Sequence, residues 1–470
     1  MTIPQNLLSL SLCLSFFLIA CAQSYVSPDI NAPESWSFSG EDAYLSHVKA
    51  EGLDFFWWHQ FNDVHLNEIV GKALENNHDL KIAQARIQEA TASASYPSLL
   101  PTFSVTGNVS RQGGQSSLAG LDRPNNLSSV GVLAAWDLDL NGRLRHEDAA
   151  RDAIVNRVRA EYDQTFLNLI TQVAQTYLDV RYFQNLLFLI EKNVEVQKET
   201  VRVTSLQESA GAVGKLDSTR AKAQLLHTQA RIPTVKSSLA KAFHRLSVLV
   251  AEPPQYMKKE LDTKKELPVV AAPLFLDKPV HILRCRPDIK AAEFLFQEAF
   301  ENKNVRLAEI FPNISLSGFF GIGRSAIYGA SVPWSFGANI LGNLLDFGRI
   351  ESQIDVAEAQ KQQSFLAFQR TILLAMEDVE NNLISYSTEK EAYKKYEEEI
   401  LHRRKALEIA RLQFKAGGVD FLNVLNEEER LLDAEVAELG ARYRSVYTMM
   451  SLYRSFGLPA LADRQGAACQ

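Results

Sequence analysis

The chain has 470 residues, which is enough for two or three compact domains or for one elongated assembly. Its composition, with 46% hydrophobic and 22% charged residues, is that of a folded protein and excludes global disorder. The formal net charge of −7 leaves no basic footprint, so nucleic acid is not an expected partner.

The N-terminus begins with an apolar stretch at residues 7–20 that ends in Leu-Ile-Ala-Cys. About 14 apolar residues are too few to span a bilayer but fit the apolar part of a signal peptide. The ending resembles the lipobox of bacterial lipoproteins, in which the cysteine is lipidated, and Ala22 in place of aspartate resembles the outer-membrane destination. We therefore predict a signal peptide over 1–20 and lipidation of Cys21, although no Lys or Arg precedes it. The alternative is an ordinary apolar N-terminus with a chance cysteine.

The rest of the chain repeats itself after roughly 200 residues, which predicts two copies of one structural unit. The matching pairs keep one order and nearly one spacing: 79–90 with 288–299, 101–107 with 312–318, 140–143 with 346–349, 210–218 with 416–424, and Pro253 with Pro459. We predict a lipidated N-terminal segment at 21–60, a first repeat at 61–255 and a linker at 256–284. A second repeat at 285–460 and a C-terminal tail at 461–470 follow.

Each repeat is predicted to begin with a helix and to continue with two strands. Apolar residues with the spacing of one helix face open the first copy: Leu66, Ile69, Val70, Ala73 and Leu74. Period-two alternation then predicts strands in 101–110 and 128–140, and in 312–323 and 333–345, separated by loops at 112–126 and 324–333. One side of each strand is apolar and the other is small or polar.

A long helix without Gly or Pro follows the strands in each copy, from Arg143 to about Ser209 and from Arg349 to about Ala416. About 65 helical residues would reach about 100 Å, which no compact core can bury. Steps of three, four and seven predict a coiled-coil seam, interrupted by Gln184: Ile170, Val173, Tyr177, Val180, Leu187, Val194 and Val201. A Gly-containing turn then predicts an antiparallel hairpin with a second helix of about 35–40 residues.

Strands of this length and alternation suit a transmembrane β-barrel, and four of them cannot close one, because lipid tolerates no open sheet edge. The chain is therefore expected to form oligomers in which each subunit contributes four strands. The alternative is a soluble, half-buried sheet.

These elements resemble TolC-type outer-membrane efflux proteins, in the lipoprotein branch of NodT- and OprM-like channels. The resemblance covers roughly 54–459 and rests on these motifs: LIAC, ALENNHDL, PSLLP, LDLNGR, RCRPDIKAAE, LLDFGR and the paired hairpin turns. It implies a homotrimer with a 12-stranded barrel in the outer membrane and an α-helical tunnel into the periplasm. It also implies passive, gated conduction, a periplasmic adaptor and an inner-membrane pump as partners, and contact with outer-membrane lipid.

The resemblance places the pore constriction just after the second hairpin turn. It assigns the pore leucine to Leu422 and the acid positions to Asn423 and Asn426. This sequence has amides where relatives often carry aspartate, which leaves cation selectivity open because three-fold symmetry would make each acid a ring of three. The acids at 427–429 are another source of charge, and the alternative is that they form a solvated helix face.

The segment Asp137-Leu-Asp-Leu-Asn-Gly-Arg resembles a calcium loop, with Asp148 as a twelfth-position acid. An alternating strand precedes it and the second copy keeps only the Gly-Arg, so we interpret it as a strand that turns at Gly142 and starts a helix. The histidines have no ligand spacing, and the cysteines form neither a CxxC pair nor a metal spacing. A disulfide between Cys285 and Cys469 stays open. GxSxG, HExxH and P-loop motifs are not present.

We therefore predict a mainly α protein with a membrane β-barrel, built from a two-fold repeat of helix, strand pair and long coiled-coil hairpin. The expected function is that of the outer-membrane channel of a tripartite efflux system, lipid-anchored in the outer membrane with a periplasmic helical extension. We expect no enzymatic activity, cofactor or metal. The alternatives are the channel of a type I protein secretion system, a periplasmic coiled-coil structural lipoprotein, and a calcium-binding or enzymatic periplasmic protein.

Overall fold

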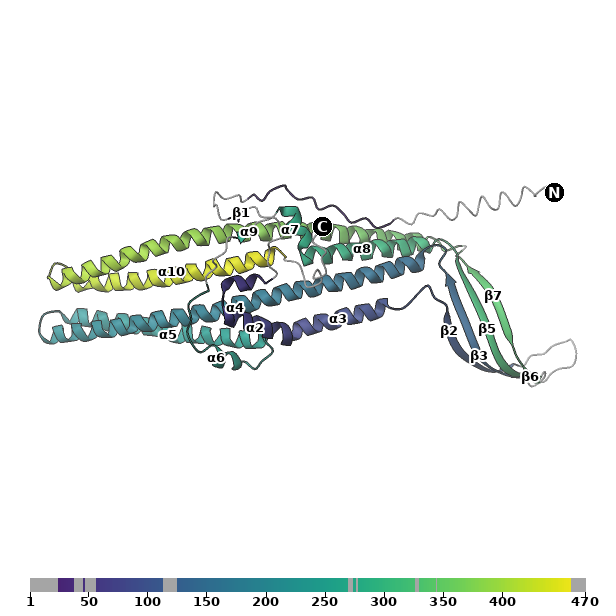
Figure 1. Cartoon of the computed structure of the whole chain (residues 1–470), viewed down its shortest axis with the longest axis horizontal. Helices are drawn as coiled ribbons and strands as arrows, with labels where there is room; N and C mark the ends of the chain where they lie inside the picture. The colour runs from purple at the N-terminus through teal and green to yellow at the C-terminus, as the bar shows by residue number, and fades with distance from the viewer. Residues whose placement is uncertain are drawn as a thin grey trace. The chain divides into compact units, whose positions relative to one another are not determined.

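The structure is a computed structural model, and it describes residues 24–37, 45–46, 56–112, 125–268, 274–275, 278–325, 329–343 and 345–457. They belong to two compact units (Figure 1). Unit 1 comprises Met1–Pro28, Arg86–Arg159 and Ala291–Gln369, and unit 2 comprises Asp29–Ala85, Ala160–Lys290 and Arg370–Gln470. The predicted signal peptide, Cys21 and the C-terminal tail lie outside the described residues.

The two long helices form as predicted. Helix α4 spans Arg143–Ser209 and α9 spans Arg349–Lys415, each with 67 residues. Each is followed by a helix of 35 residues, α5 at Lys215–Leu249 and α10 at Phe421–Ser455. The turns between them contain glycines with left-handed backbones, Gly211 and Gly417. Within unit 2, α5 lies beside α4 and α10 lies beside α9, as Figure 1 shows.

The first four residues of the predicted seam of α4 lie in the main core of unit 2: Ile170, Val173, Tyr177 and Val180. Of the seven residues of the seam, five are buried and the other two, Leu187 and Val201, are half-buried. Gln184, which interrupts the seam, is itself buried and donates from Nε2 to the carbonyl of Leu261 at 2.5 Å. A buried amide with a backbone partner is tolerated inside a core, so the interruption is stabilised rather than strained.

Shorter elements complete unit 2. They are β1 (Leu45–Ser46) paired in parallel with β4 (Leu274–Phe275), η2 (Trp57–Phe61), α2 (Val64–Asn76), α6 (Tyr256–Glu260) and α7 (Pro279–Cys285). The predicted apolar face of α2 is buried at four of its five positions. Trp57 and Trp58 are buried, with Trp57 stacked on Tyr453 at 5.3 Å between ring centroids. Cys285 is disulfide-bonded, whereas Cys469 lies outside the described residues.

Helices α3 (His78–Ala94) and α8 (Pro287–Ala308) lead from unit 2 into the strands of unit 1. The strands are β2 (Thr102–Gln112), β3 (Asn125–Leu138), β5 (Asn313–Ser325), β6 (Gly329–Ser331) and β7 (Trp334–Leu341). They form one antiparallel sheet in the order β2-β3-β5-β7, which Figure 1 shows as a curved blade. Four strand segments were predicted, and the structure adds β6 inside the second predicted loop.

Strand β6 is a continuation of β7 rather than a fifth row of the sheet. Both pair with β5 in one unbroken register, since Gly323 lies opposite Ser331 and Phe320 lies opposite Trp334. The interruption falls at Pro333, which has no N–H to donate, although its carbonyl accepts from the amide of Gly321 at 3.0 Å. The first predicted loop was also too long, because β2 and β3 extend into both of its ends.

Among the described residues, no helix is long and apolar enough to cross a bilayer.

Candidate functional site

The sheet of unit 1 exposes large apolar side chains at alternate positions. On β2, Phe103, Val105 and Val109 are 72%, 79% and 86% exposed, and on β7 Trp334 and Phe336 are each 75% exposed. Side chains at alternate strand positions share one face, so these residues form one apolar surface. The other face of β2 carries Ser, Thr and Asn. Such exposure costs free energy in water and suits a face in contact with lipid or protein.

The corner between β3 and α4 is built by a carboxylate that caps the helix. Asp139 accepts from the amides of Leu144 and Arg145 at 2.9 and 3.0 Å, and from Arg145 Nε at 3.1 Å. Gly142 supplies the turn with a φ of +77°, which favours glycine. Both carboxylate oxygens of Asp139 accept hydrogen bonds from the start of α4. This acid therefore caps the helix. Among the described residues, no group of three or more His, Cys, Asp or Glu is placed to hold a metal ion.

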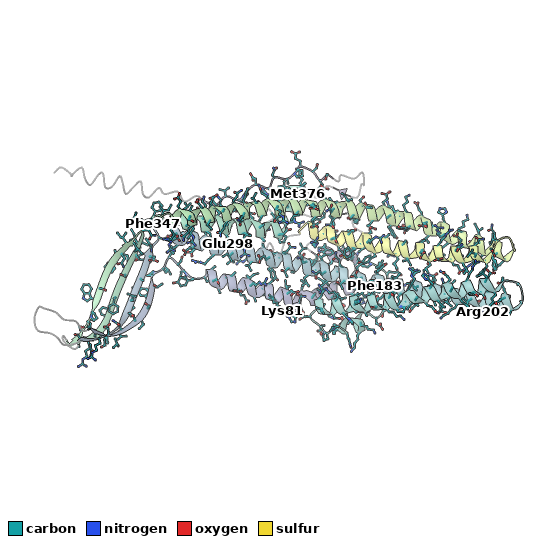
Figure 2. The ribbon with its side chains drawn as sticks, turned by 180° about the vertical axis from the view of Figure 1, so that it is seen from behind. Lys81, Phe183, Arg202, Glu298, Phe347 and Met376 are labelled. Atoms are coloured by element: carbon teal, nitrogen blue, oxygen red, sulfur yellow. The ribbon has the colours of Figure 1, made fainter. Side chains whose placement is uncertain are left out.

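The corner between β7 and α9 uses a different carboxylate for the same purpose. Asp346 accepts from the amides of Gly348 and Ile350 at 3.2 and 3.0 Å. These backbone N–H groups hold the pKa of Asp346 below its usual value, because they stabilise the ionised form. Phe347 has a left-handed φ of +54° and is 97% exposed (Figure 2). The sequence comparison of the two copies missed this shared capping.

The first turns of α10, just after the hairpin turn, carry the three residues predicted to constrict the pore. Leu422, Asn423 and Asn426 are all exposed on the first turns of α10, and Leu422 is 36% exposed. The intervening Val424 and Leu425 are buried with Phe421 in a small core that also contains Leu407 and Ala410 of α9. This core fixes the rotation of the helix, so the three predicted residues present one common face.

The acids that follow are not one solvated face. Glu428 is buried and accepts from Arg411 Nη2 of α9 at 2.7 Å, with the hydroxyl of Thr200 at 3.4 Å. Glu427 is half-buried and pairs with Arg430 at 2.7 Å. Only the next acid, Glu429, is exposed. Two of the three candidate charges therefore already have cationic partners within the chain.

Two buried side chains that the sequence analysis did not single out hold the helix ends of unit 2. Arg286, in the RPDI motif just before α8, donates to the carbonyl of Ser455 at 2.6 Å and to Asp288 and Asp378. Asn77, just before α3, donates to the carbonyl of Leu249 at 2.9 Å. Each therefore binds an otherwise open carbonyl at the end of the last helix of its repeat. They occupy equivalent positions, two residues before the matched segments 79–90 and 288–299, and this was a signal that could have found them.

The comparisons with known proteins agree with this arrangement. The model of the family described as outer membrane efflux protein matches residues 69–252 and 279–458. Nodulation protein T of Rhizobium leguminosarum bv. trifolii is 28% identical over 447 residues, which cover 93% of this chain and 94% of that protein. The pyoverdine export outer membrane protein OpmQ of Pseudomonas aeruginosa is 26% identical over 481 residues, with 99% of both chains covered.

The fold is similar to that of solved channels. The outer-membrane channel OprN superposes with a TM-score of 0.82 at 28% identity and covers 92% of this chain and 98% of its own. CusC superposes with a TM-score of 0.79 at 23% identity, covering 93% and 99%. The predictions of a TolC-type relationship, of an efflux channel and of the outer membrane as its location are confirmed. The chain belongs to the outer membrane efflux protein family.

Proposed function

We propose that this chain is the outer-membrane channel component of a tripartite efflux system and that three copies form one gated tunnel for small molecules. The observation that carries the proposal is the four-stranded sheet, which has an apolar face and two edge strands, β2 and β7. In lipid, each unpaired N–H or C=O at an edge costs several kcal/mol. Pairing β7 of one copy with β2 of the next removes every edge when the ring closes.

Three copies are the expected number. Three sheets of four strands give a 12-stranded barrel, whereas two copies give eight strands, which leaves little or no space for a channel. The family supports a trimer continued by an α-helical tunnel. The equal lengths of α4 and α9, and of α5 and α10, support a two-fold repeat within each copy. With two hairpins from each copy, the tunnel would then be lined by a pseudo-six-fold set of hairpins.

The partners follow from the family. A periplasmic adaptor would join the hairpin turns to an inner-membrane pump, which supplies the energy and selects the substrate. The relatives are named for different cargoes, including pyoverdine for OpmQ and cations for CusC of Escherichia coli. This range supports a channel whose substrate is determined by its pump. The tunnel itself is expected to conduct passively.

The N-terminus is proposed to anchor each copy in the membrane through lipid on Cys21, after removal of residues 1–20. The first described residues beyond this cysteine are held against α8 of the same unit. Tyr25 contacts Phe296 and Phe300 with ring centroids 6.0 and 5.7 Å apart, and Ser27 donates to Glu293 at 2.5 Å. The remaining proposed boundaries are a segment at 21–60, repeats at 61–255 and 285–460, a linker at 256–284 and a tail at 461–470.

The constriction is proposed to be a ring of Leu422, Asn423 and Asn426 from three copies. These residues share one exposed face of α10 just after the hairpin turn. A leucine ring narrows the passage, and two rings of amides present dipoles rather than charges to a passing ion.

Single-channel recording tests the proposed function most directly. Purified protein that migrates as a heat-modifiable trimer is reconstituted into a planar bilayer, and the current is measured under an applied voltage. We expect discrete, long-lived conductance steps. A well-folded trimer that gives a flat trace would refute the channel, and a folded protein that never forms a trimer would refute the assembly.

A further inference from the structure

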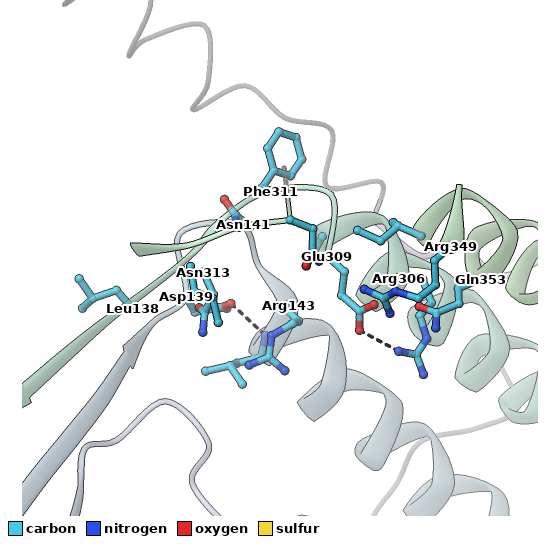
Figure 3. Close-up of a pocket in the computed structure, with 16 residues that line it drawn as sticks. Leu138, Asp139, Asn141, Arg143, Arg306, Glu309, Phe311, Asn313, Arg349 and Gln353 are labelled. Carbon is cyan, nitrogen blue, oxygen red and sulfur yellow. Dashed lines mark hydrogen bonds and ion pairs between the residues drawn. The ribbon is translucent and has the colours of Figure 1, made fainter. Parts of the chain in front are cut away.

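A polar pocket of about 430 Å³ lies in unit 1 where the two strand–helix corners meet the end of α8 (Figure 3). Three arginines from three helices line it: Arg143 is the first residue of α4, Arg349 is the first residue of α9, and Arg306 belongs to the last turn of α8. Four amide side chains also line the pocket, namely Asn141, Asn313, Asn343 and Gln353. The pocket therefore gathers N–H donors from elements far apart in the sequence.

The acids at this pocket do not neutralise its arginines completely. Arg306 pairs with Glu309 at 2.7 Å, and Arg143 pairs with Glu147, which lies outside the lining, at 2.5 Å. Asp139 is engaged by the amides of α4 and by Arg145. Arg349 makes no ion pair with a described carboxylate within 4.0 Å, although it interacts electrostatically with Asp346 three residues before it. The lining holds three arginines and two acids, Asp139 and Glu309, so it keeps a net positive charge.

The surface beside the pocket is apolar. Phe347, Leu345 and Leu341 of the same corner are 97%, 79% and 77% exposed, and Ile310 beside the end of α8 is 56% exposed. Arg349 begins its helix shortly after β7 ends, so the arginines lie at the boundary between the apolar strands and the polar helices. Cationic donors next to exposed apolar side chains match an anionic head group that carries acyl chains.

We propose that this pocket binds a phosphate group through Arg143, Arg306 and Arg349. The planar guanidinium group donates two parallel hydrogen bonds to a phosphate, and charge-assisted bonds of this kind are among the strongest in proteins. The amides of Asn313 and Gln353 supply further donors without adding charge. The phosphate comes either from a phospholipid of the leaflet that borders the corner or from a free phosphate in the surrounding solution.

The test is a calorimetric titration of the full-length protein in a phosphate-free detergent buffer. The two probes are inorganic phosphate and dihexanoyl phosphatidylglycerol, and dihexanoylglycerol, which has no phosphate, is the control ligand. The variants are the double Arg143→Gln/Arg349→Gln and the single Arg349→Gln, and the side chain of Arg349 is exposed. Arg202→Gln, near the other end of α4 and paired with Glu199, is the matched control variant.

We expect the wild type to bind a phosphate-bearing probe and the double variant to bind it about 10-fold more weakly or worse, since charged hydrogen bonds are lost. Arg202→Gln should bind like the wild type. Tighter binding of the short-chain lipid than of inorganic phosphate identifies a lipid head group, and the reverse order identifies a free phosphate. The proposal would be overturned if the wild type bound neither probe. It would also be overturned if both Arg349→Gln and the double variant bound a probe as tightly as the wild type does.

Discussion

Ala251 has a left-handed backbone, with a φ of +59°, just after the end of α5. Gly457 has nearly the same conformation, with a φ of +62°, just after α10. An L-residue with a side chain loses roughly 1–2 kcal/mol in this region compared with the right-handed one, whereas glycine does not. We predict that Ala251→Gly raises the free energy of unfolding by about 1 kcal/mol, measured by denaturant unfolding followed by circular dichroism.

The reverse change at the second copy is the matched control. In Gly457→Ala the new Cβ would lie 2.5 Å from Cγ and 2.7 Å from Cα of Arg286, which is itself fixed by Ser455 and Asp288. We expect a loss larger than the gain at Ala251, because steric overlap adds to backbone strain. Equal and opposite effects at the two positions would show that the contact with Arg286 is unimportant.

Asp179 is predicted to make stability depend on pH. Burial raises its pKa above the usual 3.8, although the hydroxyl of Tyr443 donates to it at 2.6 Å and opposes the shift. A folded-state pKa above the unfolded one stabilises the fold below the unfolded value, and this contribution is lost as pH rises through the folded pKa. Asp179→Asn keeps an acceptor for Tyr443 and cannot ionise.

We therefore expect the wild type to lose stability relative to Asp179→Asn as pH rises from about 3.8 toward neutrality. The measurement is the melting temperature of both proteins across this range. Parallel curves would contradict the burial argument. Tyr443→Phe is the control for the hydrogen bond, because it removes the donor while the carboxyl stays in place.

At the scale of elements, the helix starts at the two corners offer a direct comparison. Asp139→Ala removes the acceptor for the amides of Leu144 and Arg145, and such a cap is worth about 1 kcal/mol. We expect faster hydrogen exchange of these two amides and a matching loss of stability. Asp139→Asn should recover part of it, since an amide oxygen still accepts.

Asp346 should behave in the same way at the start of α9, with an added dependence on pH. Its pKa is lowered in the fold, so its capping contribution is present above the unfolded pKa and disappears as pH falls through the folded one. Asp346→Ala should therefore accelerate exchange at Ile350 near neutral pH and have little effect in strong acid. An effect independent of pH would indicate that the ionised form is not the cap.

The long elements could be predicted from the sequence, while their ends and partners could not. A long stretch without Gly or Pro that ends at a glycine turn predicts a long helix. Helices α4 and α9 end within one residue of the prediction. The strand opposite β5 is interrupted at Pro333, because proline has no N–H to donate to its neighbour. Alternation alone does not reveal which strand will lie beside it. The same limit applies to Glu428, since its partner Arg411 lies on another helix.

At the scale of the whole molecule, the sheet has two open edges that one chain cannot satisfy. Alternation in the sequence was enough to predict this deficit, because strand number and lipid together require closure. The arginine pocket was not predictable in this way. The repeated Gly-Arg pair was visible in the sequence. However, its two arginines and Arg306 come together only through the strand order β2-β3-β5-β7 and the two strand–helix corners.

The proposed constriction gives the prediction for the assembled channel. Asn423→Asp/Asn426→Asp would place up to six carboxylates around the axis of a trimer, so cations should be attracted and anions repelled. We expect the reversal potential in a potassium chloride gradient to move toward the potassium equilibrium value.

The first-copy counterpart of Asn423 is Asp217, which lies on the first turn of α5. Asp217→Asn is therefore the matched control, and it should leave the reversal potential unchanged if the second hairpin alone forms the constriction. An unchanged potential in the double variant, or an equal and opposite shift in Asp217→Asn, would show that the ring lies elsewhere.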